Sequence, residues 1–421
     1  MSKNIIFSKL PYIFMVFAVN IYGLFNQRMK WNRRVRKLLG EYIRIDYLPY
    51  DDSHKFIKIP KPDGGISRNK PSCLENYDLL CNKSNIYKVL STSGTTGSGF
   101  KYPVSQEFLD HLWAIYWKFR FCHGLTEKDW FAYFIGKEMI PVDRLNPPFW
   151  IKSYTTRQLL FSQSHLSPDT VELYLKRLFS SKIQCIHAYP STLSYFCKLI
   201  EEQGLVNLAQ KCNIKFISVS SESLSFSQKN VIEKVFQCKV VQIYGMTEGV
   251  VNIFECEEGS LHVDEYFSQV CFHSVKGINS YDVSGSSYHN NAFPLKDYET
   301  GDRVNIENAH DCKCGRTSRT ITEIIGRKDD YITLPDGRKI GRLDHIFKEQ
   351  TNIIESQIHQ KDDYSVVCYV VHNEEFNDVD LKKLQLELQQ KLGTSISFKI
   401  EFVSKINRTA SGKLKAVISE I

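Results

Sequence analysis

TSGTTGSGFK, residues 92–101, is the stretch that decides the fold. It follows a short apolar run at residues 87–90 that is typical of a β-strand, and it consists almost wholly of glycine and small hydroxyl residues. Such a loop can wrap a polyphosphate with backbone N–H groups and hydroxyls, and Lys101 adds positive charge at its end. It is not a Walker loop, because no Gly-Lys-Ser/Thr sequence closes it. Taken alone, the stretch is equally compatible with a flexible linker.

Strand-like and helix-like segments alternate after this loop. Helical spacing covers residues 106–121 and 228–236, and buried strands are expected at 182–187, 216–219 and 240–243. This alternation predicts an α/β sheet, whereas residues 254–325 have a weaker helix signal and predict a β-rich subdomain. Beyond Gly326 the pattern predicts a small α+β unit. Its expected elements are a hairpin at 331–340, helices near 343–350 and 378–392, and strands near 364–371 and 397–403.

Composition excludes several classes of protein. The 421 residues are 42% hydrophobic and 24% charged, with a mean hydropathy of −0.29, which excludes a disordered chain, a fibrous repeat and a multi-span membrane protein. The net charge of +7 is modest and argues against a nucleic-acid partner. Twelve cysteines in a chain of this length indicate a reducing, cytoplasmic setting or a metal site rather than a disulfide scaffold.

The N-terminal region allows three interpretations. Residues 10–25 are apolar except for Asn20, but the run is shorter than the roughly 20 residues that span a bilayer. A cluster of basic residues follows directly: Arg28, Lys30, Arg33, Arg34, Arg36 and Lys37. The favoured interpretation is a helix packed on the body of the protein with a solvated basic continuation. The alternatives are an interfacial membrane anchor over residues 10–37 and a cleaved signal peptide.

Four further motifs follow the Gly/Thr loop in order. They are Tyr244-Gly245-Met246-Thr247-Glu248, Thr300-Gly301-Asp302, Gly326-Arg327-Lys328-Asp329-Asp330 and the C-terminal run from Asn407 to Lys413. Together the five motifs resemble the adenylate-forming superfamily of acyl-CoA synthetases, in particular the phenylacetate–CoA ligase type and its capsular polysaccharide biosynthesis branch. The resemblance covers residues 90–415. It implies a large multi-sheet α/β N-terminal domain over 1–328 and a small α+β C-terminal lid over 329–421, with a hinge at Asp329.

The resemblance also implies which residues bind ATP. The phosphates would be held by Thr92, Ser93, Gly94, Thr95, Thr96, Gly97 and Lys101. The usual Pro-Lys ending of this loop is replaced here by Gly99-Phe100-Lys101. Adenine would lie against Tyr244, Gly245 and Met246, and against the turn formed by Ser220, Ser221 and Glu222. Asp302 would accept the ribose hydroxyls, and Arg327 would contact ribose or phosphate.

Three residues are expected to act in the chemical step. By the same resemblance, Thr247 would contact the α-phosphate, and Glu248 would hold Mg²⁺ among the phosphates. Lys413 would stabilise the charge that builds when a carboxylate attacks the α-phosphorus and pyrophosphate departs. No general base is expected, because the substrate carboxylate is already ionised.

A second group of residues has the chemistry of a metal site. Cys256 and His262 precede Cys312 and Cys314 by about 50 residues, and three thiolates with one imidazole suit a tetrahedral structural zinc site. The spacing is not a standard zinc-finger signature, so unpaired thiols are the alternative. The family resemblance favours zinc, since related proteins often carry a similar Cys-X-Cys-Gly-Arg run.

The expected reaction is ATP-dependent activation of a carboxylic acid as acyl-AMP, followed by transfer to CoA or another thiol. One alternative transfers the acyl group to a sugar amine or hydroxyl during polysaccharide assembly. Another is a non-catalytic nucleotide-binding scaffold at the membrane. The acyl pocket is expected near residues 187–191 and 244–250, but the sequence defines neither the acid nor the oligomeric state.

Overall fold

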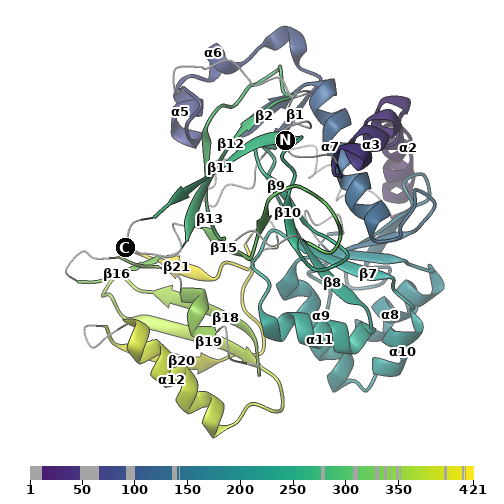
Figure 1. The fold of residues 1–421 in the computed structure, drawn as a ribbon. Helices are drawn as coiled ribbons and strands as arrows, with labels where there is room; N and C mark the ends of the chain where they lie inside the picture. The colour runs from purple at the N-terminus through teal and green to yellow at the C-terminus, as the bar shows by residue number, and fades with distance from the viewer. Residues whose placement is uncertain are drawn as a thin grey trace.

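The computed structural model describes residues 12–47, 66–91, 100–134, 140–141, 143–275, 280–306, 312–327, 331–335, 339–341, 343–347, 350, 352–392, 396–409, 412 and 414–421. Within these residues the expected α/β architecture is confirmed, with several sheets in the larger part and a separate sheet in the C-terminal part (Figure 1). The division between residues 328 and 329 stays a prediction, because 328–330 lie outside the described residues.

A mixed sheet organises the larger part. The described strands follow the order β14-β10-β9-β8-β7-β6-β3-β5-β4, with a parallel centre from β5 to β8 and antiparallel pairs outside it. The strands are β3 (Phe131–Phe134), β4 (Trp150–Ser153), β5 (Gln158–Phe161), β6 (Cys185–Ala188), β7 (Phe216–Ser220), β8 (Lys239–Gly245), β9 (Asn252–Glu255), β10 (Leu261–Val263) and β14 (Thr320–Ile321). The strands expected at 182–187, 216–219 and 240–243 are therefore confirmed as β6, β7 and β8.

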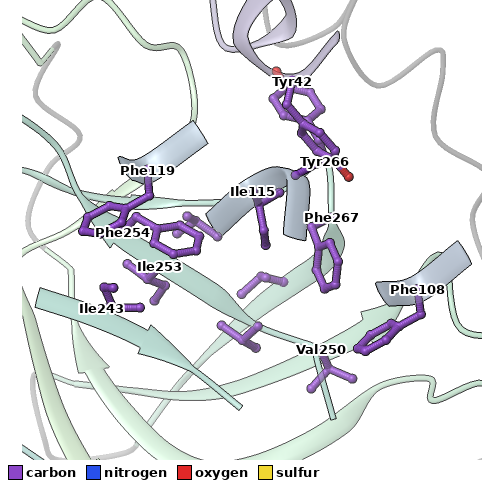
Figure 2. Packing of buried hydrophobic residues seen from close by; sticks show 14 of the residues in the cluster. Tyr42, Phe108, Ile115, Phe119, Ile243, Val250, Ile253, Phe254, Tyr266 and Phe267 are labelled. Carbon is purple, nitrogen blue, oxygen red and sulfur yellow. The ribbon is translucent and has the colours of Figure 1, made fainter. Parts of the chain in front are cut away.

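Both faces of this sheet are covered, which explains why its central strands are almost continuously apolar. Along β7, Phe216 belongs to one buried cluster and Ile217 to the other, as alternation along a strand requires. Figure 2 shows the first cluster, in which Phe119 of α7 packs against Phe254 of the sheet. The second cluster lies under the helices α8 (Val171–Ser180), α9 (Pro190–Glu202), α10 (Val206–Lys211) and α11 (Phe226–Phe236).

The expected β-rich subdomain is confirmed. From β9 to β15 every described regular element is a strand. A four-stranded antiparallel sheet, in the order β11-β12-β13-β15, carries two of the nucleotide motifs. Its strands are β11 (Ser268–Ser274), β12 (Tyr281–Ser287), β13 (Tyr298–Asn305) and β15 (Glu323–Arg327). The strands β1 (Lys88–Ser91) and β2 (Lys101–Val104) form a hairpin that precedes α7 (Gln106–Cys122).

The C-terminal part is built on a four-stranded sheet in the order β20-β19-β18-β21. Its elements are β16 (Tyr331–Thr333), β17 (Lys339–Gly341), β18 (Ile353–Gln360), β19 (Val366–His372), α12 (Asp378–Leu392), β20 (Phe398–Phe402) and β21 (Val417–Ser419). The expected hairpin, the helix at 378–392 and two strands are confirmed. The helix expected near 343–350 is a 3₁₀ turn, Leu343–Phe347, and β18 was not expected at all.

Two helices at the N-terminus pack on the larger part: α2 (Tyr12–Lys30) and α3 (Arg33–Ile45). Met15 of α2 is buried against Ile140 and Ile151, so the favoured expectation of a helix packed on the body is confirmed for one face of α2. Among the described residues, no helix is both long and apolar enough to cross a membrane. Three short elements follow: α5 (Lys70–Glu75), α6 (Tyr77–Leu80) and the 3₁₀ turn Lys83–Asn85.

Candidate nucleotide site and candidate metal centre

Two of the expected nucleotide motifs meet at the carboxyl end of β8. Tyr244 is the second-last residue of this strand, and its hydroxyl donates to Asp302 Oδ2 of β13 at 2.6 Å. Burial raises the pKa of Tyr244 well above its ordinary value, and the Asp302 carboxylate raises it further, so the phenol stays a donor. Because strand ends are where open α/β sheets bind ligands, this edge is a suitable place for a nucleotide.

Arg327 joins the same pair from β15. It lies opposite Asp302 in the β13–β15 register, and its Nη1 donates to the carbonyl of Thr300 at 3.1 Å, 4.0 Å from Asp302 Oδ1. Gly301 makes this approach feasible: its φ is +77°, and a Cβ there would lie 3.2 Å from the guanidinium. The Thr-Gly-Asp motif therefore accommodates the arginine as well as supplying a carboxylate.

Thr247 and Glu248 follow in the turn after β8, behind Gly245 and Met246. Glu248 is buried, and the Tyr298 hydroxyl donates to its Oε1 at 3.4 Å. Burial raises the pKa of Glu248 above its usual value. A nearby cation would favour the ionised form of this buried carboxylate, so Glu248 is suited to bind a metal ion.

The turn after β7 contacts the C-terminal part through Glu222. Ser221 has a φ of +71° in this turn, and Glu222, which follows it, is half-buried. Glu222 Oε2 accepts from the backbone N–H of Ser191 at 3.1 Å, and Oε1 accepts from the N–H of Leu414. Burial raises the pKa of Glu222, although both N–H groups favour its carboxylate form. This contact to residue 414 could not be read from the sequence.

The described neighbours of Lys413 are both held against the larger part. A Cβ on Gly412 would lie 3.1 Å from Gln163 Oε1, and Leu414 is fixed by Glu222. Upstream in the same motif, Arg408 pairs with the fully buried Glu355 of β18. Gln163 and Glu355 were missed by sequence reasoning; Arg408 lay inside a recognised motif, whereas nothing in the sequence marked the other two.

Several expected site residues lie outside the described residues. They are Thr92, Ser93, Gly94, Thr95, Thr96, Gly97, Asp329 and Lys413. Their flanks are informative, because Ser91 pairs with Lys101 across the β1–β2 hairpin. The Gly/Thr loop therefore connects two strands, and Lys101 is the first paired, exposed residue of β2.

The expected acyl segment begins at the end of β6, next to the turn after β7. His187 Nδ1 lies 2.8 Å from Ser218 Oγ, and its Nε2 lies 3.4 Å from Ser220 Oγ. Burial lowers the pKa of His187 to about 4, so its imidazole is neutral at pH 7. Ser220, which belongs to the expected nucleotide turn, thus also contacts the expected acyl segment.

The four expected metal ligands converge. The ligand atoms of Cys256, His262, Cys312 and Cys314 all lie within 4.8 Å of one another, although the two pairs are 50 positions apart in the sequence. The Cys256 and Cys312 sulfurs are 3.6 Å apart, and the Cys314 sulfur is 3.3 Å from His262 Nε2. Tetrahedral zinc with bonds of about 2.3 Å to sulfur requires edges of about 3.8 Å, so the cluster has the right size.

The surroundings of this cluster suit a cation. His262 Nδ1 lies 3.1 Å from Ser318 Oγ, which leaves Nε2 facing the thiols. Burial lowers the pKa of His262 and raises those of Cys256 and Cys314, the last to about 12. The imidazole is therefore neutral, and a bound cation would favour the thiolate forms of Cys256 and Cys314.

A buried charge network adjoins the cluster. Lys118 of α7 bridges Asp46 at 2.9 Å and Asp264 at 2.8 Å, and Arg316 pairs with Asp46 and Glu257. Burial alone would lower the pKa of Lys118, but the two carboxylates raise it above its ordinary value. A cavity of about 30 Å³, large enough for a water molecule, lies between this network and the Cys/His cluster.

A second group of potential ligands is built differently. Glu107, His111 and His289 bring their ligand atoms within 4.8 Å of one another. The two imidazole rings are stacked, however, with centroids 3.5 Å apart and planes 5° from parallel. Imidazole lone pairs lie in the ring plane, so parallel rings direct them side by side instead of at one ion. Of these two groups of described residues, the cysteine cluster is therefore the better candidate for a metal centre.

Comparison with known proteins agrees with this arrangement. Residues 332–420 match the family described as the CapK C-terminal domain. The chain is 26% identical over 367 residues to "Protein CapK" of Staphylococcus aureus, covering 84% of this chain and 79% of that protein. This similarity supports the capsular branch of the expected resemblance.

Solved structures share the architecture. A 2-hydroxyisobutyryl-CoA ligase in the postadenylation state, in complex with 2-HIB-AMP, superposes with a TM-score of 0.60 at 16% identity, covering 98% of this chain and 91% of the ligase. An anthranilate CoA ligase in complex with anthranoyl-AMP gives a TM-score of 0.50 at 13% identity, covering 78% and 66% of the two chains. The chain therefore has the fold of the adenylate-forming acyl-CoA ligases and is similar to CapK over most of its length.

Proposed function

We propose that the protein activates a carboxylic acid with ATP, forming acyl-AMP and pyrophosphate. The observation that carries the proposal is a continuous set of contacts between motifs far apart in the sequence. It runs from Tyr244 through Asp302 to Arg327, and from the turn at Glu222 to Leu414 beside Lys413. Ser223 joins the two halves, since its hydroxyl donates to the carbonyl of Ile325.

In the first step, a carboxylate oxygen of the acid attacks the α-phosphorus, and the bond to the β-phosphate bridging oxygen breaks. Tyr244 would stack on adenine, and Asp302 with Arg327 would hold the ribose. Lys413 would stabilise the charge that moves onto departing pyrophosphate, and Thr247 would contact the α-phosphate. Glu248 would hold Mg²⁺, which neutralises phosphate charge when it is bound.

For the second step we propose transfer of the acyl group to CoA or another thiol. Sulfur attacks the acyl carbon, and AMP leaves with the electron pair of the broken bond. Gly412 and Leu414 lie against the larger part, which suits the first step. The thiol would therefore reach the acyl carbon only after the lid turns about Asp329. The size of the Cys/His cluster supports a further proposal, that zinc has a structural role there.

A cytoplasmic setting fits the thiols. All twelve cysteines lie among the described residues and are free. Both expected metal-site pairs would be at risk of oxidation elsewhere, so a reducing compartment suits this chain best.

The test is exchange of labelled pyrophosphate into ATP, measured across a panel of carboxylic acids. We expect acid-dependent exchange, and addition of CoA should convert the best acid into a thioester. If exchange occurs but only an amino sugar or a polysaccharide hydroxyl accepts the acyl group, the thiol step is wrong and adenylation stands. No exchange with any acid, in protein shown to bind ATP, would favour a nucleotide-binding scaffold and refute the proposal.

A further inference from the structure

We infer that the outer face of α2, together with the basic start of α3, docks on an anionic membrane surface. Five large apolar side chains of α2 face away from the protein. At 100° per residue their positions fall within an arc of about 100°, so they form one stripe. They are Ile13 (72% exposed), Phe14 (56%), Phe17 (64%), Ile21 (43%) and Leu24 (55%).

Polar contacts of α2 outside the stripe fix its orientation. The Tyr12 hydroxyl donates to the carbonyl of Trp150 at 3.0 Å. Asn20 donates to the carbonyl of Lys152 and accepts from the N–H of Tyr154, and Gly23 lies directly against Thr155. Because these polar contacts all lie on one side, α2 cannot rotate to bury its stripe without breaking them.

The basic residues at the start of α3 favour an anionic partner for this surface. The exposed residues Arg33, Arg34, Arg36 and Lys37 begin α3, which carries five basic residues and one acidic residue, Glu41. The first turn of α3 has no acidic residue, and both helices pack on α7. In Figure 1 the two helices lie at the same corner of the molecule.

This combination fits lipid better than a second copy of the chain. An apolar stripe beside basic residues matches the boundary between acyl chains and anionic headgroups. Two copies meeting through the same surface would bring their basic clusters near each other, where like charges repel.

The test is co-sedimentation of the full chain with phosphatidylcholine vesicles, with and without phosphatidylglycerol. We expect binding to the anionic vesicles, weakened at least about tenfold by Phe14→Gln with Phe17→Gln, and also by Arg33→Gln with Arg36→Gln. The matched control is Val379→Gln with Leu386→Gln, which changes exposed apolar residues of α12 and should not alter binding. Pyrophosphate exchange without vesicles should be unchanged in all variants, which shows that they fold.

Two results would overturn the inference. One is absence of binding to anionic vesicles, or binding that the α2 and α3 variants leave unaltered. The other is a concentration-dependent dimer in light scattering that the Phe14/Phe17 variant abolishes, because the stripe would then be a contact between copies. Neither result bears on adenylation, which the exchange assay measures independently.

Discussion

The Cys/His cluster and the nucleotide site differ in how their parts are held. All four ligands of the cluster have described positions, and their atoms lie within 4.8 Å of one another. The nucleotide site is a chain of pairwise contacts between β8, β13, β15 and the C-terminal segment, each linking one motif to the next. The first arrangement suits permanent binding of one small ion, and the second suits a site whose parts must separate to release product.

This contrast predicts that substitutions in the two regions will have different consequences. Changes in the nucleotide site should alter the rate of adenylation while leaving the fold intact. Changes in the metal centre should alter stability while leaving the rate per folded molecule intact. Five substitutions, in four groups ordered by their expected effect on adenylation, test the contrast.

Lys413→Ala should have the largest effect. Loss of one transition-state cation should reduce adenylation by about 100- to 1,000-fold, measured as pyrophosphate exchange. Thioester formation from supplied acyl-AMP should survive, because the proposed second step has the lid turned away. Lys415→Ala, the same change two residues later, is the control and should retain exchange. Equal loss in both half-reactions would contradict the role proposed for Lys413.

Asp302→Ala should raise KM for ATP by about 10- to 100-fold, since the proposed acceptor for the ribose hydroxyls is lost. Tyr244→Phe removes the hydroxyl that donates to Asp302 but keeps the ring, so its effect should be smaller, below about tenfold. Steady-state kinetics with varied ATP measures both. An unchanged KM in Asp302→Ala would show that ATP binds elsewhere.

Glu222→Gln should lower kcat of adenylation by about tenfold with little change in KM for ATP. The amide keeps one acceptor oxygen, so one of the two N–H groups of Ser191 and Leu414 loses its partner and the lysine loop is held less well. A rise in KM for ATP with unchanged kcat would instead place this side chain at the adenine, as the sequence resemblance implied.

Cys312→Ser should have the smallest effect on adenylation: the rate per folded molecule should not change. It should reduce zinc content from about one ion per chain to near zero and lower Tm by about 5 °C or more. Metal analysis and thermal denaturation measure these changes. Cys271→Ser, which replaces a cysteine outside the cluster, should retain zinc. Protein purified without chelators that contains no zinc would refute the assignment.

Sequence reasoning succeeded for buried strands such as β7, which are short apolar runs. It also grouped three cysteines and one histidine by residue type, and the structure brings their ligand atoms within 4.8 Å of one another, while metal binding there stays a prediction. It failed for β18, whose central Glu355 and Gln357 are polar and yet buried. The partners of these two side chains are distant in sequence: Arg408 pairs with Glu355 from 53 residues away, and the carbonyl of Lys415 accepts from Gln357. The same limit applies to Lys118, whose partners Asp46 and Asp264 lie far from it along the chain.

Arg316 links the loop of the Cys/His cluster to helix α3. It follows Cys314 by two residues and pairs with Asp46, which caps the C-terminal end of α3. The loop that carries Cys312 and Cys314 and the basic helix are thus joined through one buried guanidinium, where separation of charges is costly. If zinc occupies the cluster as proposed, metal depletion should therefore loosen α3 and weaken the proposed attachment to anionic vesicles.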